Sequence, residues 1–304
     1  MQQQQPTIPQ TQTPLPAKQT LPTMYDLPSE DPEEPGLPDE FHSWQPQLLS
    51  RTLRLPDYPS DRIFVAADLN LYYDVHHTQW HKRPDWFLVL DVSRLSEGTD
   101  LRSSYVVWQE GTNPFLVVEL LSPGTEKEDL GQFVEVEVDA IEENNGQITR
   151  ETPPRKWDVY ERILRVPYYV VFSRYSDRLR IFELNGGRYQ EKSLDLDNPR
   201  FWIPQLKLGL GVWQGEFEGV NRRWLRWYDG MGNWMPTEAE LAIAQAEVAV
   251  AQAEVAVAQA KLEAELAIAD TEKERQKRLE LAAKLKSLSS EQLTALGINL
   301  EDLE

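Results

Sequence analysis

A repeat of seven residues governs the end of this chain. Gln245–Val250 (Gln-Ala-Glu-Val-Ala-Val) recurs letter for letter at 252–257. Alanine is the strongest helix former, and neither Gly nor Pro interrupts residues 237–296. The repeat therefore predicts one continuous α-helix over residues 238–287, within a C-terminal segment that spans 236–304. Its larger apolar residues fall seven apart, at Leu241, Val248, Val255 and Leu262.

Heptad spacing of this kind is typical of a coiled coil. Valines on an isolated helix stay exposed to water, so we expect residues 238–287 to join copies of the chain into a homo-oligomer, most simply a dimer. The alternative is a single solvated helix, which alanine by itself favours. Further on, Ser289 and Gln292 have the spacing of a capping box, which predicts a short last helix that ends at Gly297.

The rest of the chain divides near residue 40. Residues 1–40 are rich in Gln, Pro and acidic side chains and hold few apolar ones, so we expect a disordered leader. All ten Trp lie between Trp44 and Trp234, which indicates one globular domain at 41–235. The chain has no Cys, no secretory signal pattern at its start, and no uninterrupted apolar run near the ~20 residues of a membrane span. We therefore expect a cytoplasmic protein with no membrane contact.

Charge bears on whether nucleic acid is a partner. The net charge of −19 is unfavourable for nonspecific binding, because phosphates are repelled. Residues 152–235 are an exception, with 14 Lys/Arg against 10 Asp/Glu and a local net charge of +4. Within them, Arg222–Trp227 interleaves basic and aromatic residues, a pattern of nucleic-acid binders and equally of an amphipathic terminal strand. A DNA-facing surface on the domain is therefore compatible with the sequence.

The domain mixes helical and strand patterns. Apolar residues at helical spacing predict a helix that begins near Phe41, capped by Asp39, and another over Lys156–Arg165. Asn185-Gly186-Gly187 is a hairpin signal. This order predicts an α/β fold with a mixed sheet flanked by helices, followed by the long C-terminal helix. β-Branched and aromatic runs predict strands over Arg62–Tyr73, Trp86–Val92, Pro114–Leu121, Tyr168–Phe172 and Leu179–Glu183.

Two acidic residues lie at the ends of predicted strands. Asp85 opens the strand Trp86–Val92, and Glu119 closes the apolar run Phe115–Val118. A carboxylate at the end of a buried strand is unfavourable unless it is paired or binds a metal ion. Two carboxylates on neighbouring strands can hold a divalent cation, which activates water for hydrolysis of a phosphodiester. The alternative is that Asp85 belongs to a turn and Glu119 pairs with an arginine.

Other polar groups give weaker patterns. No carboxylate has regular spacing to His76, His77 and His81, which favours a loop over a metal cluster. Ser122 lacks both a Gly-x-Ser-x-Gly elbow and an evident histidine partner, so serine-hydrolase chemistry is not expected.

A series of sequence blocks resembles the Uma-two family. Lys156–Tyr160, followed by Val166–Val171, is similar to the helix-to-strand block of that family. The resemblance covers about residues 41–235 and is to its cyanobacterial type, here with a C-terminal coiled coil. The four preceding blocks are Val65-Ala66-Ala67-Asp68-Leu69, Arg83-Pro84-Asp85, Trp108-Gln109-Glu110-Gly111 and Val117-Val118-Glu119-Leu120-Leu121-Ser122-Pro123-Gly124.

The resemblance implies a fold similar to restriction endonucleases of the PD-(D/E)XK superfamily and a nuclease that depends on Mg²⁺ or Mn²⁺. Asp85 and Glu119 match the two metal-binding acids, with the carbonyl of Leu120 or Leu121 as a further ligand. The acid-x-lysine pattern expects lysine at position 121, where this chain has Leu121. In this family a lysine from the next helix is thought to substitute, and Lys156 is the matching residue.

One departure from the family weakens this assignment. An acidic insertion at 132–155 separates the Ser-Pro block from the helix that carries Lys156, which makes Lys127 the second candidate for the lysine. The insertion, the net acidity and the missing lysine at 121 favour a rival function, an inactive nuclease-fold scaffold that assembles through its coiled coil. Retention of Asp85, Glu119 and Lys156 favours the enzyme.

Overall fold

The computed structural model describes residues 39–122, 125–133 and 152–297. Two compact units divide them, one that ends at Thr237 and holds every strand seen in these residues, and one that begins at Glu238 and is helical. The predicted leader up to residue 38, and positions 134–151 of the predicted insertion, lie outside the described residues.

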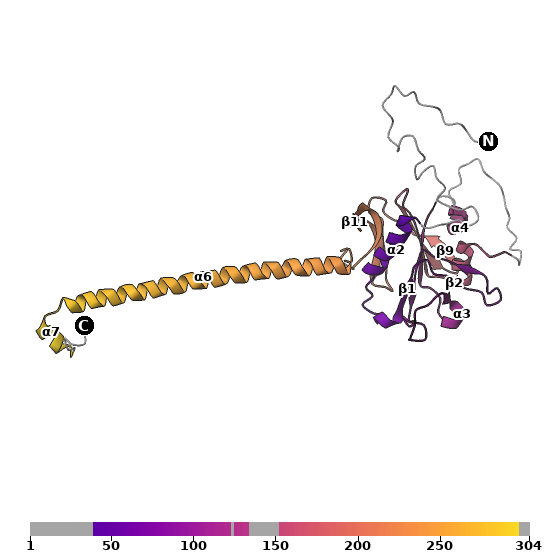
Figure 1. Ribbon diagram of the computed structural model, residues 1–304. Helices are drawn as coiled ribbons and strands as arrows, with labels where there is room; N and C mark the ends of the chain where they lie inside the picture. Colours follow the sequence, from indigo (N-terminus) through magenta and orange to yellow (C-terminus); the bar gives the residue numbers. More distant parts are fainter. Residues whose placement is uncertain (1–38, 123–124, 134–151, 298–304) are drawn as a thin grey trace, which may run out of the picture. The chain divides into compact units, whose positions relative to one another are not determined.

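A six-stranded mixed sheet forms the centre of the first unit (Figure 1), in the order β1-β4-β6-β7-β8-β9. Neighbouring strands are antiparallel except β6 and β7, which are parallel. The predicted mixed α/β fold is therefore confirmed. The strands are β1 (Ile63–Ala66), β4 (Trp86–Leu90), β6 (Leu116–Leu120), β7 (Tyr168–Ser173), β8 (Arg178–Asn185) and β9 (Arg188–Glu191).

Two smaller sheets complete the unit. An antiparallel sheet contains β10 (Arg200–Ile203), β11 (Leu208–Phe217) and β12 (Val220–Tyr228). The other contains β2 (Leu71–Tyr72), β3 (His81–Lys82) and β5 (Tyr105–Val106). The helical elements are α2 (Glu40–Thr52), η1 (Ser60–Arg62), α3 (Val107–Glu110), α4 (Glu126–Asp129), η2 (Gly131–Phe133), α5 (Lys156–Asp158) and η3 (Val159–Ile163).

The central strands bury both faces of the sheet. Every residue of β4 and β6 is buried, which is why these strands read as continuous apolar runs. On the first face, which we call the α2 face, Trp86, Val118 and Val170 pack with α2 and the β10–β12 sheet. On the opposite face, the α5 face, their sequence neighbours pack against α5 and η3. Alternation along each strand therefore decides which layer a side chain enters.

Helix α2 is fastened to β12 by an amide. The buried Gln45 side chain donates Nε2–H to the Leu225 carbonyl (2.9 Å), and its Oε1 accepts the Leu225 N–H (2.8 Å). Trp227 Nε1 donates to the Leu49 carbonyl (3.0 Å). The predicted N-cap is confirmed, because an Asp39 carboxylate oxygen accepts the His42 N–H (3.1 Å). These contacts fix the first turn of α2, which carries His42.

Two predicted elements differ from what the structure shows. The strand expected over Arg62–Tyr73 is wrong as a single element, because Asp68 has φ of 54° and turns the chain between β1 and β2. The helix expected over Lys156–Arg165 lies where predicted, but it is α-helical only over α5 and continues as the π-helical turn η3. The hairpin at Asn185-Gly186-Gly187 is confirmed, with Asn185 paired to Arg188 and positive φ at both glycines.

The second unit contains the predicted long helix. Helix α6 runs uninterrupted from Glu238 to Lys286 (Figure 1), and none of its residues is buried. Helix α7 (Ser290–Ala295) follows, and its predicted capping box is confirmed by the bond from Ser289 N–H to Gln292 Oε1 (3.0 Å) and by the return bond from Gln292 N–H to Ser289 Oγ (3.4 Å).

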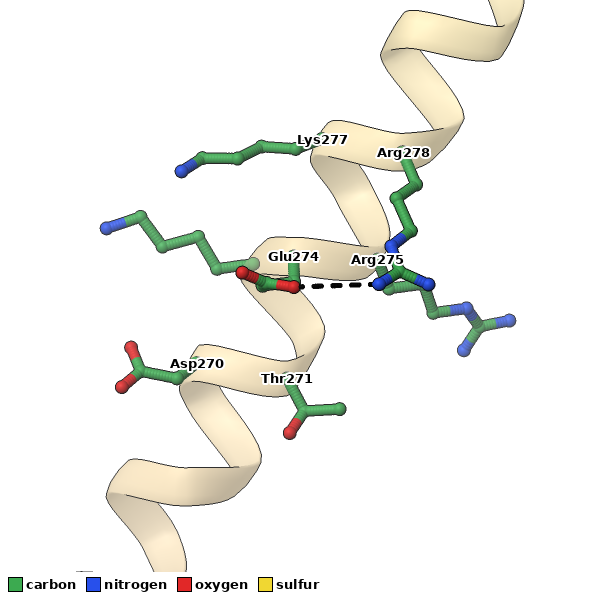
Figure 2. Close-up of a pocket in the computed structure, with 7 residues that line it drawn as sticks. Asp270, Thr271, Glu274, Arg275, Lys277 and Arg278 are labelled. Atoms are coloured by element: carbon green, nitrogen blue, oxygen red, sulfur yellow. Dashed lines mark ion pairs between the residues drawn. The ribbon is translucent and has the colours of Figure 1, made fainter.

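Helix α6 changes character along its length. Alanine and valine dominate up to residue 260, whereas residues 270–278 are nearly all charged or polar. Figure 2 shows these polar side chains radiating from the helix, with Glu274 paired to Arg278 at 3.9 Å. Side chains that spread from one helix have no opposite wall, so they do not enclose a ligand.

Among the described residues, α6 is the one helix long and apolar enough to cross a membrane, with mean hydropathy of 1.4 over its most apolar 18 residues. Only the length and the composition of α6 support a membrane span. A span through the repeat would bury Glu247 and Glu254 in hydrocarbon, at a cost of about 2.5–3.5 kcal/mol each near the bilayer centre.

Candidate active site

The strand register brings the two predicted acids together. β4 and β6 are antiparallel and Trp86 pairs with Val118, so the next residues, Asp85 and Glu119, are neighbours across the ladder. Both alternate with residues of the α2 face and therefore lie on the α5 face. Asp85 Oδ2 accepts the Leu120 N–H (2.6 Å), which ties the start of β4 to the end of β6.

Lys156 reaches the same point despite the insertion. Its Nζ lies 2.9 Å from Glu119 Oε2 and 3.2 Å from Asp129 Oδ1. The lysine side chain is 22% exposed, while those of Glu119 and Asp129 are 0% and 2% exposed. Tyr160, one helical turn after Lys156, donates its hydroxyl to Glu119 Oε1 (2.8 Å). Glu119 is therefore held by a lysine and a tyrosine rather than by an arginine. The side chain of Lys127, the second candidate, lies outside what the structure describes.

Contacts on both sides of the insertion hold Lys156 in place. Glu128 Oε1 accepts the Lys156 backbone N–H (2.9 Å), and the Phe133 and Trp157 rings lie 5.3 Å apart. Gly131 is needed for this approach, since it has φ of 53° and a Cβ there would meet Trp157 Cγ at 2.6 Å.

Substituting Gly131 is expected to displace Lys156. In Gly131→Ala the added methyl collides with Trp157 and a left-handed backbone position is strained, which together should lower the free energy of unfolding by about 2–4 kcal/mol. Urea denaturation of both proteins measures the loss. Gly98→Ala is the matched control, because Gly98 also has positive φ but a Cβ there meets no atom within 4 Å. Equal losses in the two variants would contradict the Trp157 contact as the cause.

The three carboxyl groups outnumber the one ammonium group. Burial raises the pKa of the Glu119 carboxyl well above its usual value, and Asp85 and Asp129 raise it further against the effect of Lys156. Burial also raises the pKa of Asp85, opposed by Lys156 and His42. For Lys156, burial alone lowers the pKa, but Asp129, Glu119 and Asp85 outweigh it and raise the pKa well above the usual value. The lysine therefore stays charged at neutral pH, whereas burial and the neighbouring acids disfavour the ionised forms of Glu119 and Asp85.

Asp129 is a residue that sequence reasoning missed. It is buried at the end of α4, and its Oδ1 has no hydrogen-bond partner although the Lys156 ammonium is near. The segment Glu126–Asp129 contains three acids in four positions, so the sequence offered no means to select the one that faces inward.

His42 is a second missed residue. Its Nε2 lies 2.9 Å from the Leu120 carbonyl oxygen, the expected metal ligand, and its Nδ1 lies 2.8 Å from Asp39 Oδ1. Arg174 Nη2 pairs with the other Asp39 oxygen (2.5 Å). Burial lowers the His42 pKa, but the bond to Asp39 and the charge of Asp85 outweigh it and raise the pKa. Helix α2 thus contributes, from a distant part of the sequence, a histidine whose cationic form is favoured by its neighbours.

The structure also corrects the expectation for Ser122, which does have a histidine nearby. Ser122 Oγ lies 3.3 Å from His42 Nε2, and Asp39 lies on the other side of the ring. The resemblance to a Ser-His-Asp triad stops at the proton, because Nε2 bonds the Leu120 carbonyl at the shorter distance of 2.9 Å and a carbonyl only accepts. A nitrogen that donates there has no lone pair to accept the serine proton.

A cleft of about 460 Å³ lies in front of these groups. Its lining residues are His42, Asp68, Arg83, Asp85, Leu120, Ser122, Thr125, Glu128, Asp129 and Lys156. Arg83 and Asp68 form an exposed ion pair at its edge (2.6 Å), and Lys82 pairs with Glu128 (2.7 Å). The lining of the cleft therefore contains both acidic and basic side chains.

The donor atoms of this cleft fit a divalent cation. Asp85 and Leu120 line the cleft and Glu119 is buried beside Asp85, so two carboxyl groups and a backbone carbonyl can supply the oxygen ligands that Mg²⁺ and Mn²⁺ prefer. In the part of the chain that is described, no three His, Asp or Glu side chains form a metal cluster by themselves. A backbone carbonyl or water would have to complete the coordination, as is usual for Mg²⁺.

Two weaker sequence patterns find structural explanations. Trp224 and Trp227 of β12 are buried, so they have no face free to stack on a base, and the amphipathic terminal strand is the better interpretation of Arg222–Trp227. His77 stacks on Trp80 (3.9 Å between ring centroids) and pairs with Asp74, while His81 lies in β3.

The sequence model of one family matches most of the chain. The Uma2 family, whose description is "putative restriction endonuclease", matches residues 15–217. The chain belongs to the Uma2 family. This confirms the resemblance found in the sequence, although the match ends at Phe217 and thus leaves β12 outside. A search of curated proteins found no match. Asp85, Glu119, Asp129 and Lys156, the four residues of this cluster, all lie within the Uma2 match.

Proposed function

We propose that this Uma2-family chain is a metal-dependent endonuclease that hydrolyses phosphodiester bonds of DNA. The observation that carries the proposal is the meeting of Asp85, Glu119 and Lys156 at one edge of the central sheet, with Lys156 Nζ 2.9 Å from Glu119. Asp85 directly precedes β4, Glu119 lies in β6 and Lys156 begins α5, and both Asp85 and Lys156 line the open cleft.

Asp85, Glu119 and the Leu120 carbonyl would hold Mg²⁺ or Mn²⁺. A divalent ion bound there supplies a water of lowered pKa and stabilises negative charge on the phosphate. In hydrolysis the water oxygen bonds to phosphorus while one P–O bond of the diester breaks, and the leaving oxygen takes a proton.

Lys156 has the properties of an electrostatic catalyst. Its ammonium stays charged through neutral pH, because the surrounding carboxylates raise its pKa, and its 22% exposure leaves it open to the cleft. A fixed cation near the scissile phosphate stabilises the charge that develops in the transition state. Asp129 would hold this ammonium in position through its own contact with Nζ (3.2 Å).

The cations that line the cleft favour a polyanionic substrate. Arg83, His42 and Lys156 all line it, and residues 152–235 have a local net charge of +4. Because the whole chain is acidic, attraction to DNA would be local and weakened by salt. The expected cytoplasmic location is compatible with this substrate and stays a prediction.

The test is nicking of supercoiled plasmid DNA by the purified full chain. We expect conversion to open circles when Mg²⁺ or Mn²⁺ is present at about 5 mM. We expect no conversion when EDTA removes the ion. Absence of nicking on supercoiled, linear and single-stranded DNA with either ion would favour the inactive scaffold instead.

Cation binding itself has a separate readout. Mn²⁺ or Mg²⁺ at about 100 times its dissociation constant is expected to raise the free energy of unfolding by about 2.7 kcal/mol, because the ion binds the folded site and not the unfolded chain. Thermal denaturation with and without the ion measures this as an increase in Tm. The control for charge screening alone is a buffer without divalent ions, brought to the same ionic strength with NaCl.

A further inference from the structure

Helix α6 carries larger apolar residues on two faces, not one. The first face consists of Leu241, Val248, Val255 and Leu262, with Ala244, Ala251 and Ala258 three positions after the first three. The second face consists of Ile243, Val250 and Val257, with Ala246, Ala253 and Ala260 three positions after each. Both faces therefore repeat every seven residues with the same composition, a larger apolar residue followed by alanine.

The two faces lie on nearly opposite sides of the helix. The second series is displaced from the first by two residues, and two residues correspond to about 200° at 3.6 residues per turn. Polar stripes separate the faces, with Gln245, Gln252 and Gln259 along one boundary and Glu247 and Glu254 along the other. A two-stranded coiled coil needs only one apolar seam, so the second face has no use in a dimer.

Both faces are open in the single chain. Leu241, Val248, Val255 and Leu262 are 41–58% exposed, and Ile243, Val250 and Val257 are 55–61% exposed. Apolar stripes of this length on a soluble helix are buried when the helix finds partners.

We propose that α6 binds further copies of this chain through both faces, so that the assembly contains more than two chains. The exact repetition of both faces supports a second copy of the chain as the occupant. In a parallel, in-register pair, each larger apolar residue packs into a hole of the facing helix that includes alanine positions. The proposal does not depend on nuclease activity.

Charge favours parallel copies along the first face. Glu247 precedes that seam and Gln252 follows it, and in a parallel pair these two positions meet across the interface. Glutamates then face uncharged glutamines, so no like charges are brought together across the interface. An antiparallel pair would instead bring Glu247 opposite Glu254 of the next copy and place like charges together.

The test compares matched variants of the full chain by sedimentation equilibrium. Val248→Glu with Val255→Glu alters the first face, and Val250→Glu with Val257→Glu alters the second face by the same chemistry and charge. We expect a wild-type mass above that of two chains, no more than two chains in either double variant, and one chain in the quadruple variant. Circular dichroism establishes that each variant keeps its helix, since Glu is a good helix former.

A wild-type dimer or monomer would overturn the proposal, as would a second-face variant with the wild-type mass. A lipid bilayer is the other apolar environment that could cover α6. Each protein is therefore also tested for co-sedimentation with phosphatidylcholine vesicles. Wild-type chains that are monomeric without vesicles and sediment with them would show a membrane segment and refute assembly between copies.

Discussion

Asp85→Asn is expected to lower the rate of metal-dependent DNA nicking by about 10³-fold, which corresponds to about 4 kcal/mol of transition-state stabilisation. An amide is a poor ligand for Mg²⁺, but its oxygen can still accept the Leu120 N–H that Asp85 accepts at 2.6 Å. The geometry at the end of β6 is therefore kept while the ligand charge is lost. Rates of open-circle formation in wild type and variant, at saturating Mn²⁺, measure the effect.

Stability should move in the opposite direction from activity. The pKa of Asp85 is raised in the folded protein, so its ionised form costs stability once the pH exceeds its unfolded pKa. A neutral Asn removes that cost, and Tm of the variant should exceed that of wild type at pH 8 but not at pH 4. Asp195→Asn, on an exposed loop, is the control for the substitution itself. Equal nicking by Asp85→Asn and wild type would assign the activity to another site or to a contaminant.

Lys156→Met is expected to cause the largest loss of stability, a decrease of about 3–5 kcal/mol in the free energy of unfolding at pH 7.5, which is the range for breaking a buried ion pair. The lysine is the cation that lies between Glu119 and Asp129, and methionine keeps its length but leaves both buried acids unneutralised. Denaturant unfolding measures the change. Lys192→Met is the surface control, since Lys192 and its partner Glu183 are both more than a third exposed and such pairs contribute about 0–1 kcal/mol.

The pH dependence tests the cause of that loss. Because the pKa of Lys156 is raised in the folded state, its contribution is complete below its unfolded pKa and disappears only as the pH rises through the folded value. The variant should therefore be destabilised throughout the neutral range. The loss should shrink towards acid pH for a separate reason, because Glu119 and Asp85 bind protons there and no longer need a neighbouring cation. A loss that stays constant from pH 8 to pH 4 would point to lost packing instead.

A divalent ion should partly replace the missing ammonium. Mn²⁺ is expected to raise Tm of Lys156→Met more than Tm of wild type, because the ion no longer competes with a resident cation. If the ion stabilises neither protein, the cluster is a structural ion pair and the proposed metal site is wrong.

The strand patterns in the sequence identified Asp85 and Glu119, because the residues next to each acid along the chain determine that it lies at the end of a buried strand. The apolar runs around Asp85 and Glu119 are long enough to predict buried strands, and each acid breaks such a run at its end. The pairing of β4 with β6 then follows the fold that the family resemblance implied. Lys156 is identified by that resemblance alone, because the insertion before it separates it in sequence from both acids.

His42 and Asp129 could not be found in this way, because tertiary contacts alone distinguish them. His42 reaches the Leu120 carbonyl only because Gln45 and Trp227 fasten α2 against β12, a contact across about half of the chain. Asp129 differs from its acidic neighbours in α4 only by facing Lys156. The break at Asp68 was missed for a local reason, since a left-handed aspartate leaves little trace in a strand-like run.

Contacts between the residues on either side of positions 134–155 make the stability of the fold nearly independent of how many residues connect them. Bonds and ring contacts already bring Glu128 to Lys156 and Phe133 to Trp157, so whatever chain connects them closes a loop between fixed anchors. The entropy of closing such a loop grows only logarithmically, with each doubling in length costing about 0.6 kcal/mol. Evolution can therefore lengthen or shorten the sequence at this position, directly beside the candidate catalytic lysine, without moving that lysine.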